Sequence, residues 1–351
     1  MASDLQIGLV FDRRYTIISR VGGGSFGVVY AAFDQRAGRE VAVKILREKA
    51  LKSPDLVARF EREGQICAAL SSPHTARLHG FYLASATPIH PEMPYMVFDL
   101  VRGLPLGLIL RERRMIRVSE AAHILVGVLD SLEEAHHAGI VHRDMKPDNV
   151  LCVPPAGSFV TPLAEGSVCD LLGVPPIDDN TWTDLTTSWV RVVDFGLGKL
   201  LAIGDRDVKP LTKAGMAAGT ANYMAPEQLR AQSIDHRADI YGAGMLLHRL
   251  ITGRETFHGH TIAAVAMAHI NQPLPQLPSA LEASPIAAVF RRAGCKNPAE
   301  RYQTAAEMAH ELRLVLDPSL AELPKPEFER PPEVRVDSGL SSVLKRMMGR
   351  K

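Results

Sequence analysis

The first third of the chain alternates between apolar and polar positions in short runs, which predicts β-strands. Residues 15–20 alternate at the strand period, and residues 40–46 and 95–98 form further apolar runs rich in β-branched and aromatic side chains. Successive side chains of a strand point to opposite faces, so each of these runs can pack one face against a core. We therefore predict several β-strands at the start of the chain.

Glycines interrupt this pattern between the first two predicted strands. Gly22, Gly24 and Gly27 are spaced G-x-G-x-x-G within residues 21–30, and a β-branched run resumes directly after them. Because glycine has no side chain, such a turn lets backbone N–H groups approach a phosphate closely. The following strand argues against a dinucleotide-binding fold, which would place a helix there; a plain glycine hairpin is the alternative.

Further along, the apolar spacing changes to the helical period. Residues 53–70 begin with Ser-Pro-Asp, a good helix start, and residues 119–139 carry a second apolar stripe that ends at a glycine. A third apolar helix opens at Asp239, and residues 190–193 form a short strand before it.

One charged pair is predicted inside these apolar elements. Lys44 lies within the strand 40–46, and Glu63 lies in the apolar stripe of the helix 53–70. A buried ammonium or carboxylate is costly without a partner of opposite charge, so we expect Lys44 and Glu63 to pair. A lysine on the solvent face of the strand and a solvated glutamate at the edge of the stripe are the alternatives.

Composition narrows the class of protein. The chain has 351 residues, 46% of them hydrophobic, which suits a two-lobed enzyme. Its net charge of +1 argues against nucleic-acid binding and gives no general attraction to anionic membranes. Four scattered cysteines indicate neither a zinc site nor a disulfide framework, so we expect a cytoplasmic location. We expect no signal peptide and no membrane span.

The candidate chemistry is concentrated in residues 142–149, His-Arg-Asp-Met-Lys-Pro-Asp-Asn, just after the second predicted helix. Asp144, Lys146 and Asn149 offer a carboxylate, an amine and an amide within six positions. A phosphoryl-transfer site needs a carboxylate to accept the proton of the attacking hydroxyl, a cation near the moving phosphoryl group and an oxygen ligand for a metal ion.

Two shorter motifs follow in order. Asp-Phe-Gly occupies residues 194–196 at the end of a strand, and Ala-Pro-Glu occupies residues 225–227. With the glycine turn, the strand lysine and the loop 142–149, they resemble the signature set of protein kinases, over about residues 15–315. Lys146 and the stretch 219–227 resemble the serine/threonine-specific, bacterial kinases of the eukaryotic (Hanks) type.

The resemblance implies a bilobal protein kinase fold of the α+β class, with a small antiparallel-sheet N-lobe and a mainly helical C-lobe. It also implies transfer of a phosphoryl group from ATP, with Mg²⁺ or Mn²⁺, to serine or threonine hydroxyls of protein substrates. The implied divisions are an N-terminal extension (1–14), an N-lobe (15–98), a hinge (99–103), a C-lobe (104–315) and a proline-rich tail with a basic end (316–351).

The resemblance also assigns roles to individual residues. Asp144 is the catalytic base, Lys146 contacts the γ-phosphate, Lys44 binds phosphates with Glu63 as its partner, and Asn149 and Asp194 bind the metal ion. Phe98 is the residue behind the adenine pocket. The remaining ATP-binding positions are Val21, Gly22, Gly23, Gly24, Ser25, Phe26, Gly27, Val29, Ala42, and the hinge from Asp99 to Val101.

Regulatory and structural roles follow from the same resemblance. Residues 194–227 correspond to the activation segment, in which Thr212 is the candidate phosphosite and Arg143 would receive its phosphate. Thr220 would position the substrate by bonding Asp144 and Lys146. Four residues are expected to be structural: Arg143, Asp239, which holds the catalytic loop (residues 142–149), and the pair formed by Glu227 and Arg301.

The chain departs from the family between Asn149 and Asp194, which are 45 positions apart (194 − 149). Kinases usually place only about a dozen residues there, so roughly 30 extra residues lie near 154–187. This insertion contains five acidic residues, five prolines and no lysine or arginine before Trp189. We expect a surface loop that docks a regulator or a basic substrate; passive packing on its own lobe is the alternative.

Two other functions fit parts of the pattern. A pseudokinase scaffold would share the fold, but Lys44, Glu63, Asp144, Asn149 and Asp194 are all present, which argues against it. A small-molecule kinase of related fold would share a similar catalytic loop, whereas residues 225–227 and Arg301 favour protein substrates.

Overall fold

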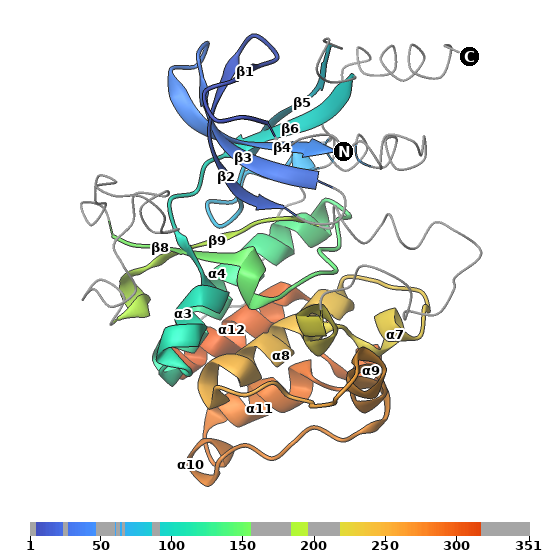
Figure 1. Cartoon of the computed structure of the whole chain (residues 1–351). Coiled ribbons are helices and arrows are strands. Elements are labelled where there is room, and N and C mark those ends of the chain that lie inside the picture. The colour runs from blue at the N-terminus through green and yellow to red at the C-terminus, as the bar shows by residue number, and fades with distance from the viewer. Residues whose placement is uncertain are drawn as a thin grey trace.

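The computed structural model describes residues 5–23, 27–46, 60, 64, 67–85, 92–155, 184–195 and 218–316. A twisted sheet forms the first part of the chain, and a group of helices forms the second part below it (Figure 1). A small second sheet lies between the two, beside α4 (Val118–His137). This arrangement confirms the predicted α+β architecture of two lobes.

The first sheet has six antiparallel strands in the order β1-β2-β3-β4-β6-β5. They are β1 (Val10–Phe11), β2 (Tyr15–Gly23), β3 (Gly27–Asp34), β4 (Arg39–Leu46), β5 (Leu78–Ala84) and β6 (Met93–Asp99). The predicted alternation is clearest in β4, where Val41, Val43 and Ile45 are buried while Ala42 and Lys44 are partly exposed on the other face. One face of the sheet therefore packs into a core, and the other face, which carries Lys44, stays partly exposed.

The buried face of this sheet forms a core of its own. Phe11, Tyr15, Tyr30 and Tyr95 pack together there with the aliphatic residues of β2, β3 and β4. β1 lies before residue 15, the predicted start of the domain, and it extends the sheet by one strand, since Phe11 is 1% exposed. Each aromatic side chain buries a large apolar area, so these residues contribute much of the stability of this small sheet.

The second sheet has the order β7-β8-β9, and all its pairings are antiparallel. The strands are β7 (Leu104–Pro105), β8 (Val150–Val153) and β9 (Trp189–Val192). β8 directly follows the predicted catalytic loop (142–149), and β9 ends two residues before Asp194. The pairing of these two strands therefore brings the two predicted chemical motifs together, although the insertion separates them in sequence.

The helical lobe is built around α4 and α8 (Arg237–Thr252), whose contact faces are almost fully buried. Its other α-helices are α3 (Leu106–Arg113), α7 (Pro226–Leu229), α9 (Ile262–Asn271), α10 (Ser279–Glu282), α11 (Pro285–Ala293) and α12 (Ala305–Leu316). Its short 3-10 helices are η1 (Pro147–Asn149), η3 (Leu185–Thr187), η4 (Ala218–Tyr223) and η5 (Pro298–Glu300). Within the described part of the chain, no helix combines the length and apolarity that crossing a membrane requires.

The loop before β5 joins the two lobes. Glu134 of α4 accepts hydrogen bonds from the backbone N–H groups of Ser71 (2.7 Å) and Ser72 (2.8 Å). The Ala76 N–H donates to the Val192 carbonyl of β9 (3.0 Å). These hydrogen bonds thus fix the N-lobe to α4 and to β9, the strand that leads into Asp194.

The described residues cover only the ends of the predicted insertion, since residues 156–183 lie outside them. Its last part, η3, is held on the N-terminal turn of α4, where buried Glu120 accepts the Leu185 N–H (2.9 Å). Arg117 also pairs with Asp184 at 3.2 Å. The tail from residue 317 onward lies outside the described residues as well.

Candidate active site

Lys44 stands on the face of β4 that the core leaves partly open. Cross-strand pairing places Val29 opposite Lys44 and Phe98 opposite Ala42, so these four predicted nucleotide-site residues share one face of the sheet. All four are partly buried, and Phe98 packs against the main core. Val21 and Gly22 lie in β2 beside this face, and Gly27 opens β3 with its Cα close to the Ile45 carbonyl.

The closest acid to Lys44 among the described residues is Asp194. Lys44 Nζ lies 2.6 Å from Asp194 Oδ1, and these residues are 150 positions apart in sequence. The charge of Lys44 is the main reason that the pKa of Asp194 lies below its usual range, although burial opposes the shift. Lys146 also lowers this pKa, so both lysines act on the same carboxylate.

Asp194 has a left-handed backbone, with φ of +59°. Non-glycine residues adopt this conformation only where their surroundings hold it, and such strain is concentrated at functional sites. The Val193 carbonyl just before it faces His142 Nε2 at 3.1 Å, and the ring of Phe195 meets the His142 ring edge-on at 4.8 Å. His142 therefore contacts the residues immediately before and after Asp194.

The hydrogen bonds of His142 define its protonation state. The Val193 carbonyl can only accept, and the Asp144 N–H can only donate, to His142 Nδ1 at 3.2 Å. The imidazole must therefore be neutral with its proton on Nε2. Burial also lowers the pKa of His142, which agrees with a neutral ring.

Three polar side chains of the catalytic loop, those predicted to carry the chemistry, lie together. Lys146 Nζ lies 2.9 Å from Asp144 Oδ2. Asn149 Nδ2 donates to the Asp144 carbonyl (2.7 Å) and contacts Asp144 Oδ2 (3.2 Å). Because the amide nitrogen of Asn149 faces Asp144, its Oδ1 lies on the opposite side of the amide group.

Asp239 at the start of α8 holds the backbone of this loop. Its carboxylate accepts the N–H groups of His142 and Arg143, both at 2.7 Å, and it contacts His136 Nε2 at 2.8 Å. Burial alone would raise the pKa of Asp239, but the hydrogen bonds from His136 and the loop outweigh it and lower the pKa. A buried carboxylate with three donors is a rigid support for the loop.

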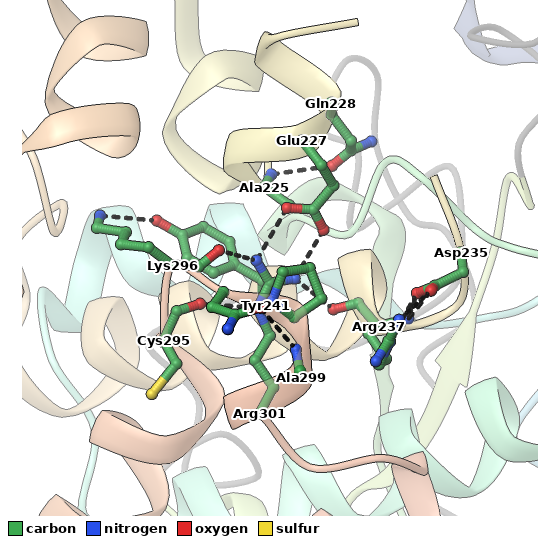
Figure 2. A network of polar contacts seen from close by, with 12 residues as sticks. Ala225, Glu227, Gln228, Asp235, Arg237, Tyr241, Cys295, Lys296, Ala299 and Arg301 are labelled. Atoms are coloured by element: carbon green, nitrogen blue, oxygen red, sulfur yellow. Dashed lines mark hydrogen bonds and ion pairs between the residues drawn. The ribbon is translucent and has the colours of Figure 1, made fainter. Parts of the chain in front are cut away.

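A second buried contact involves Glu227 of the Ala-Pro-Glu motif. Glu227 and Arg301 form a two-fold hydrogen-bonded pair at 2.7 and 2.9 Å (Figure 2). The remaining N–H groups of Arg301 donate to the backbone carbonyls of Cys295, Lys296 and Arg237. All five guanidinium N–H groups are therefore used, which explains how a charged side chain with no exposed area is tolerated.

The hinge is held by charges that sequence reasoning did not consider. The Asp99 side chain contacts His79 Nε2 at 2.7 Å and Arg39 at 3.8 Å, and Arg102 pairs with Glu40 at the start of β4. The Asp99 N–H donates to the Arg77 carbonyl (2.9 Å). These contacts fix the segment that is predicted to bind adenine.

Several predicted site residues lie outside the described residues: Glu63, Gly24, Ser25, Phe26 and Thr212. Of Thr220, only the backbone is described, within η4. The predicted pair of Lys44 with Glu63 is therefore not tested by the contacts above. Phe60, Cys67 and Leu70 from the predicted helix stripe are buried, as the helical spacing requires.

Sequence reasoning assigned no role to Gln228 or His136, which both contact the loop or its support. Gln228 had a detectable signal, since it stands three residues after Ala225 at the start of a helix with proline in its first turn. That spacing is typical of a capping residue at the third helical position. His136 carried no comparable local signal.

The comparisons with known proteins define the class. The model of the family "Protein kinase domain" matches residues 15–312, so the chain belongs to the protein kinase family. A probable serine/threonine-protein kinase of Corynebacterium efficiens is 34% identical over 330 residues, which cover 92% of this chain and 44% of that protein. The serine/threonine-protein kinase PknA of Mycobacterium tuberculosis is 31% identical, with coverage of 87% and 62%.

The chain thus spans about half the length of the curated relatives that it matches. Among solved structures, the PknI kinase domain of Mycobacterium tuberculosis superimposes with a TM-score of 0.61 at 20% identity. This match covers 89% of the present chain and 99% of that domain. At this level of identity, the match shows the bilobal fold and supports no finer comparison.

Proposed function

We propose that this chain is a serine/threonine protein kinase that transfers the γ-phosphoryl group of ATP to hydroxyl groups of protein substrates. The observation that carries the proposal is the convergence of two charged clusters. Lys44 and Asp194 form one, and Asp144, Lys146 and Asn149 form the other. The backbone N–H of Val193, the residue before Asp194, donates to the Asn149 carbonyl at 3.0 Å, so the two clusters lie side by side in one site.

Each cluster suits one half of the reaction. The Asp144 carboxylate, which contacts Lys146 and Asn149, would accept the proton of a substrate hydroxyl. Lys44 would hold the phosphates of ATP, and Lys146 would offset charge on the moving phosphoryl group. In phosphoryl transfer, positioning of the reactants and stabilisation of charge supply most of the acceleration. The protein therefore needs no covalent intermediate with the phosphoryl group.

The donor set also suits a magnesium ion. Asp194 and Asn149 would offer one carboxylate and one amide oxygen, and Mg²⁺ usually takes one or two carboxylates with substrate phosphates and water. The magnesium ion supplies neutralisation of the phosphate charges when it is bound with ATP. The left-handed backbone of Asp194 and the amide contacts of Asn149 would hold these two side chains in place.

Two regulatory roles belong to the same proposal. Thr212 would be phosphorylated and its phosphate would dock on Arg143. The insertion near 154–187 would dock a regulator or a basic substrate, and its end at η3 is fixed on α4 by Glu120 and Arg117. This attachment supports the proposal because it would hold a docking loop at one place on the C-lobe.

The test is incubation of the chain with Mg-ATP and a basic protein substrate, followed by mass-spectrometric mapping of phosphorylated residues. We expect phosphoserine or phosphothreonine on the substrate and on the chain. Asp144→Asn should still bind ATP, seen as a rise in Tm, but should lose about 100-fold or more of its phosphoryl transfer. Wild-type turnover in Asp144→Asn would remove Asp144 from the mechanism, and an inactive wild-type chain would favour a pseudokinase.

A further inference from the structure

Gln228 forms a direct bridge between the substrate side of the site and the catalytic loop. Its Oε1 accepts the backbone N–H of Ala225 at 2.9 Å (Figure 2). Its Nε2 donates to the backbone carbonyl of Arg143 at 3.0 Å. The orientation of the amide is unambiguous, because the Ala225 N–H can only donate and the Arg143 carbonyl can only accept.

The peptide groups of Arg143 are therefore held on both sides. Asp239 accepts the Arg143 N–H at 2.7 Å, and Gln228 donates to the Arg143 carbonyl. Between these two bonds, Arg143 has a φ of +63°, the left-handed conformation that is costly for a residue with a side chain. Such a conformation persists only where surrounding contacts hold it.

The position of Arg143 makes this bond relevant to catalysis. The Arg143 carbonyl belongs to the peptide unit that leads directly into Asp144, so a rotation of that unit would move the Asp144 side chain. Met145 and Tyr223 pack close to Gly242 of α8, where an added Cβ would lie 3.1 Å from Met145 and 3.3 Å from the Tyr223 carbonyl. The loop, η4 and α8 thus meet at Met145, the residue that follows Asp144.

We propose that Gln228 is a positioning residue for phosphoryl transfer. Through the Arg143 carbonyl, it holds the peptide unit before Asp144 in the conformation that aims the carboxylate at the substrate hydroxyl. Through the Ala225 N–H, it ties that conformation to the segment that places the substrate. The inference rests on the proposed kinase function and adds a residue to its machinery.

A passive role for Gln228 makes a different prediction. The bond to the Ala225 N–H also caps α7, and a glutamate at this position caps a helix as well as a glutamine does. If capping were the whole role, Gln228→Glu would be fully active, because the carboxylate keeps the acceptor for Ala225. If Gln228 positions Asp144, the same variant loses activity, because a carboxylate cannot donate to the Arg143 carbonyl.

The experiment measures kcat and KM for ATP in Gln228→Glu, Gln228→Met and the wild-type chain, with Tm as the check on folding. We expect kcat to fall about tenfold in Gln228→Glu, the factor that one lost hydrogen bond corresponds to, with KM for ATP unchanged. Gln228→Met has similar length and no charge, so an equal fall in kcat would exclude repulsion by the new carboxylate as the cause. Gln232→Glu adds the same charge at an exposed position of the same segment and should match the wild type.

The outcomes separate this inference from the proposed function. Wild-type kcat in folded Gln228→Glu, or in folded Gln228→Met if the first variant does not fold, would overturn the positioning role while leaving the kinase intact. If Gln228→Glu lowers both Tm and kcat, kcat is measured again with each protein at the same number of degrees below its own Tm. A wild-type kcat under those conditions would also overturn the positioning role, in favour of capping. An inactive wild-type chain would refute the proposed function, and the inference with it.

Discussion

At the scale of single residues, the site depends on a few charges held at short range in partly buried positions. Lys44 is 15% exposed and touches Asp194, whose own side chain is 48% exposed. An ammonium group has three donors, so Lys44 can hold a second carboxylate at the same time. This leaves room for the predicted pair with Glu63, because the contact with Asp194 uses one donor only.

Lys44→Met and Glu63→Gln should each reduce kcat/KM strongly, while the double variant should cost much less than the sum of the two losses. The physical reason is that each change removes the same ion pair, so the second change has little left to remove. The measurement is a double-mutant cycle on kcat/KM for ATP. Additive losses would mean that Glu63 acts independently of Lys44 and that Asp194 is the relevant partner of the lysine.

At the scale of helices and loops, two arginines tie distant segments together in very different surroundings. Arg301 joins the end of η5 to α7 with a side chain that is 0% exposed, and its partner Glu227 is 8% exposed. Arg313 of α12 joins Asp130 of α4 at 2.6 Å, but the two side chains are 32% and 26% exposed. Arg301 uses both of its terminal nitrogens on Glu227, whereas Arg313 contacts both oxygens of Asp130 through Nη2 alone. The N···O distances of the two pairs are similar, and the main difference between them is burial.

Arg301→Ala should lower the free energy of unfolding by about 3–5 kcal/mol, because it leaves Glu227 charged, buried and without its partner. Arg313→Ala should cost about 1 kcal/mol or less, because water can replace the lost partner of Asp130. Urea unfolding of both variants measures the contrast. Equal losses in the two variants would mean that burial does not set the cost of breaking these pairs.

At the scale of the whole molecule, burial of neutral histidines makes folding sensitive to mild acid. Burial lowers the pKa of His248 to about 4 and of His269 to about 3, and it also lowers the pKa of His142. In the unfolded chain, these groups would bind protons near pH 6.5. The unfolded state therefore binds more protons than the folded state between about pH 6.5 and 4, and stability must fall as the pH falls through that window.

The free energy of unfolding should decrease by up to about 1.4 kcal/mol per pH unit for each buried histidine below pH 6. Glu255, whose pKa burial raises, opposes part of this loss. His248→Asn keeps a donor for the Arg254 carbonyl but does not titrate. The variant should therefore lower the slope of the free energy of unfolding against pH by the contribution of one histidine. Denaturant unfolding from pH 7 to 5 measures the slope, with exposed His260→Asn as the control; an unchanged slope in His248→Asn would contradict the argument.

The insertion provides a second prediction at this scale. Replacing residues 156–183 by a short Gly-Asn turn should leave autophosphorylation and KM for ATP near wild type, because η3 and β9 stay fixed on α4 and β8. Phosphorylation of the native partner should weaken, most clearly at low salt, since the insertion carries one sign of charge. A folded deletion variant that cannot autophosphorylate would place the insertion in the catalytic machinery, and one that phosphorylates every partner normally would favour passive packing.

The sequence by itself determined the elements and the local chemistry of this protein. The strand period of residues 40–46 and the helical stripe of residues 119–139 reflect which side chains face a core, and the structure confirms both as β4 and α4. Asp144, Lys146 and Asn149 meet because they share one short loop, so their spacing along the chain was enough to predict them as a group.

Apart from the Glu227–Arg301 pair and the support of the loop by Asp239, which the resemblance named, only the tertiary structure decided which distant groups meet. Lys44 touches Asp194 across 150 positions, and Gln228 reaches the Arg143 carbonyl across 85. Periodicity reports whether a side chain is buried, but it carries no information about which segment lies opposite, since that depends on how the sheet and helices pack. The neutral state of His142 was decided in the same way, because its two partners come from Val193 of a different segment and from the backbone of its own loop.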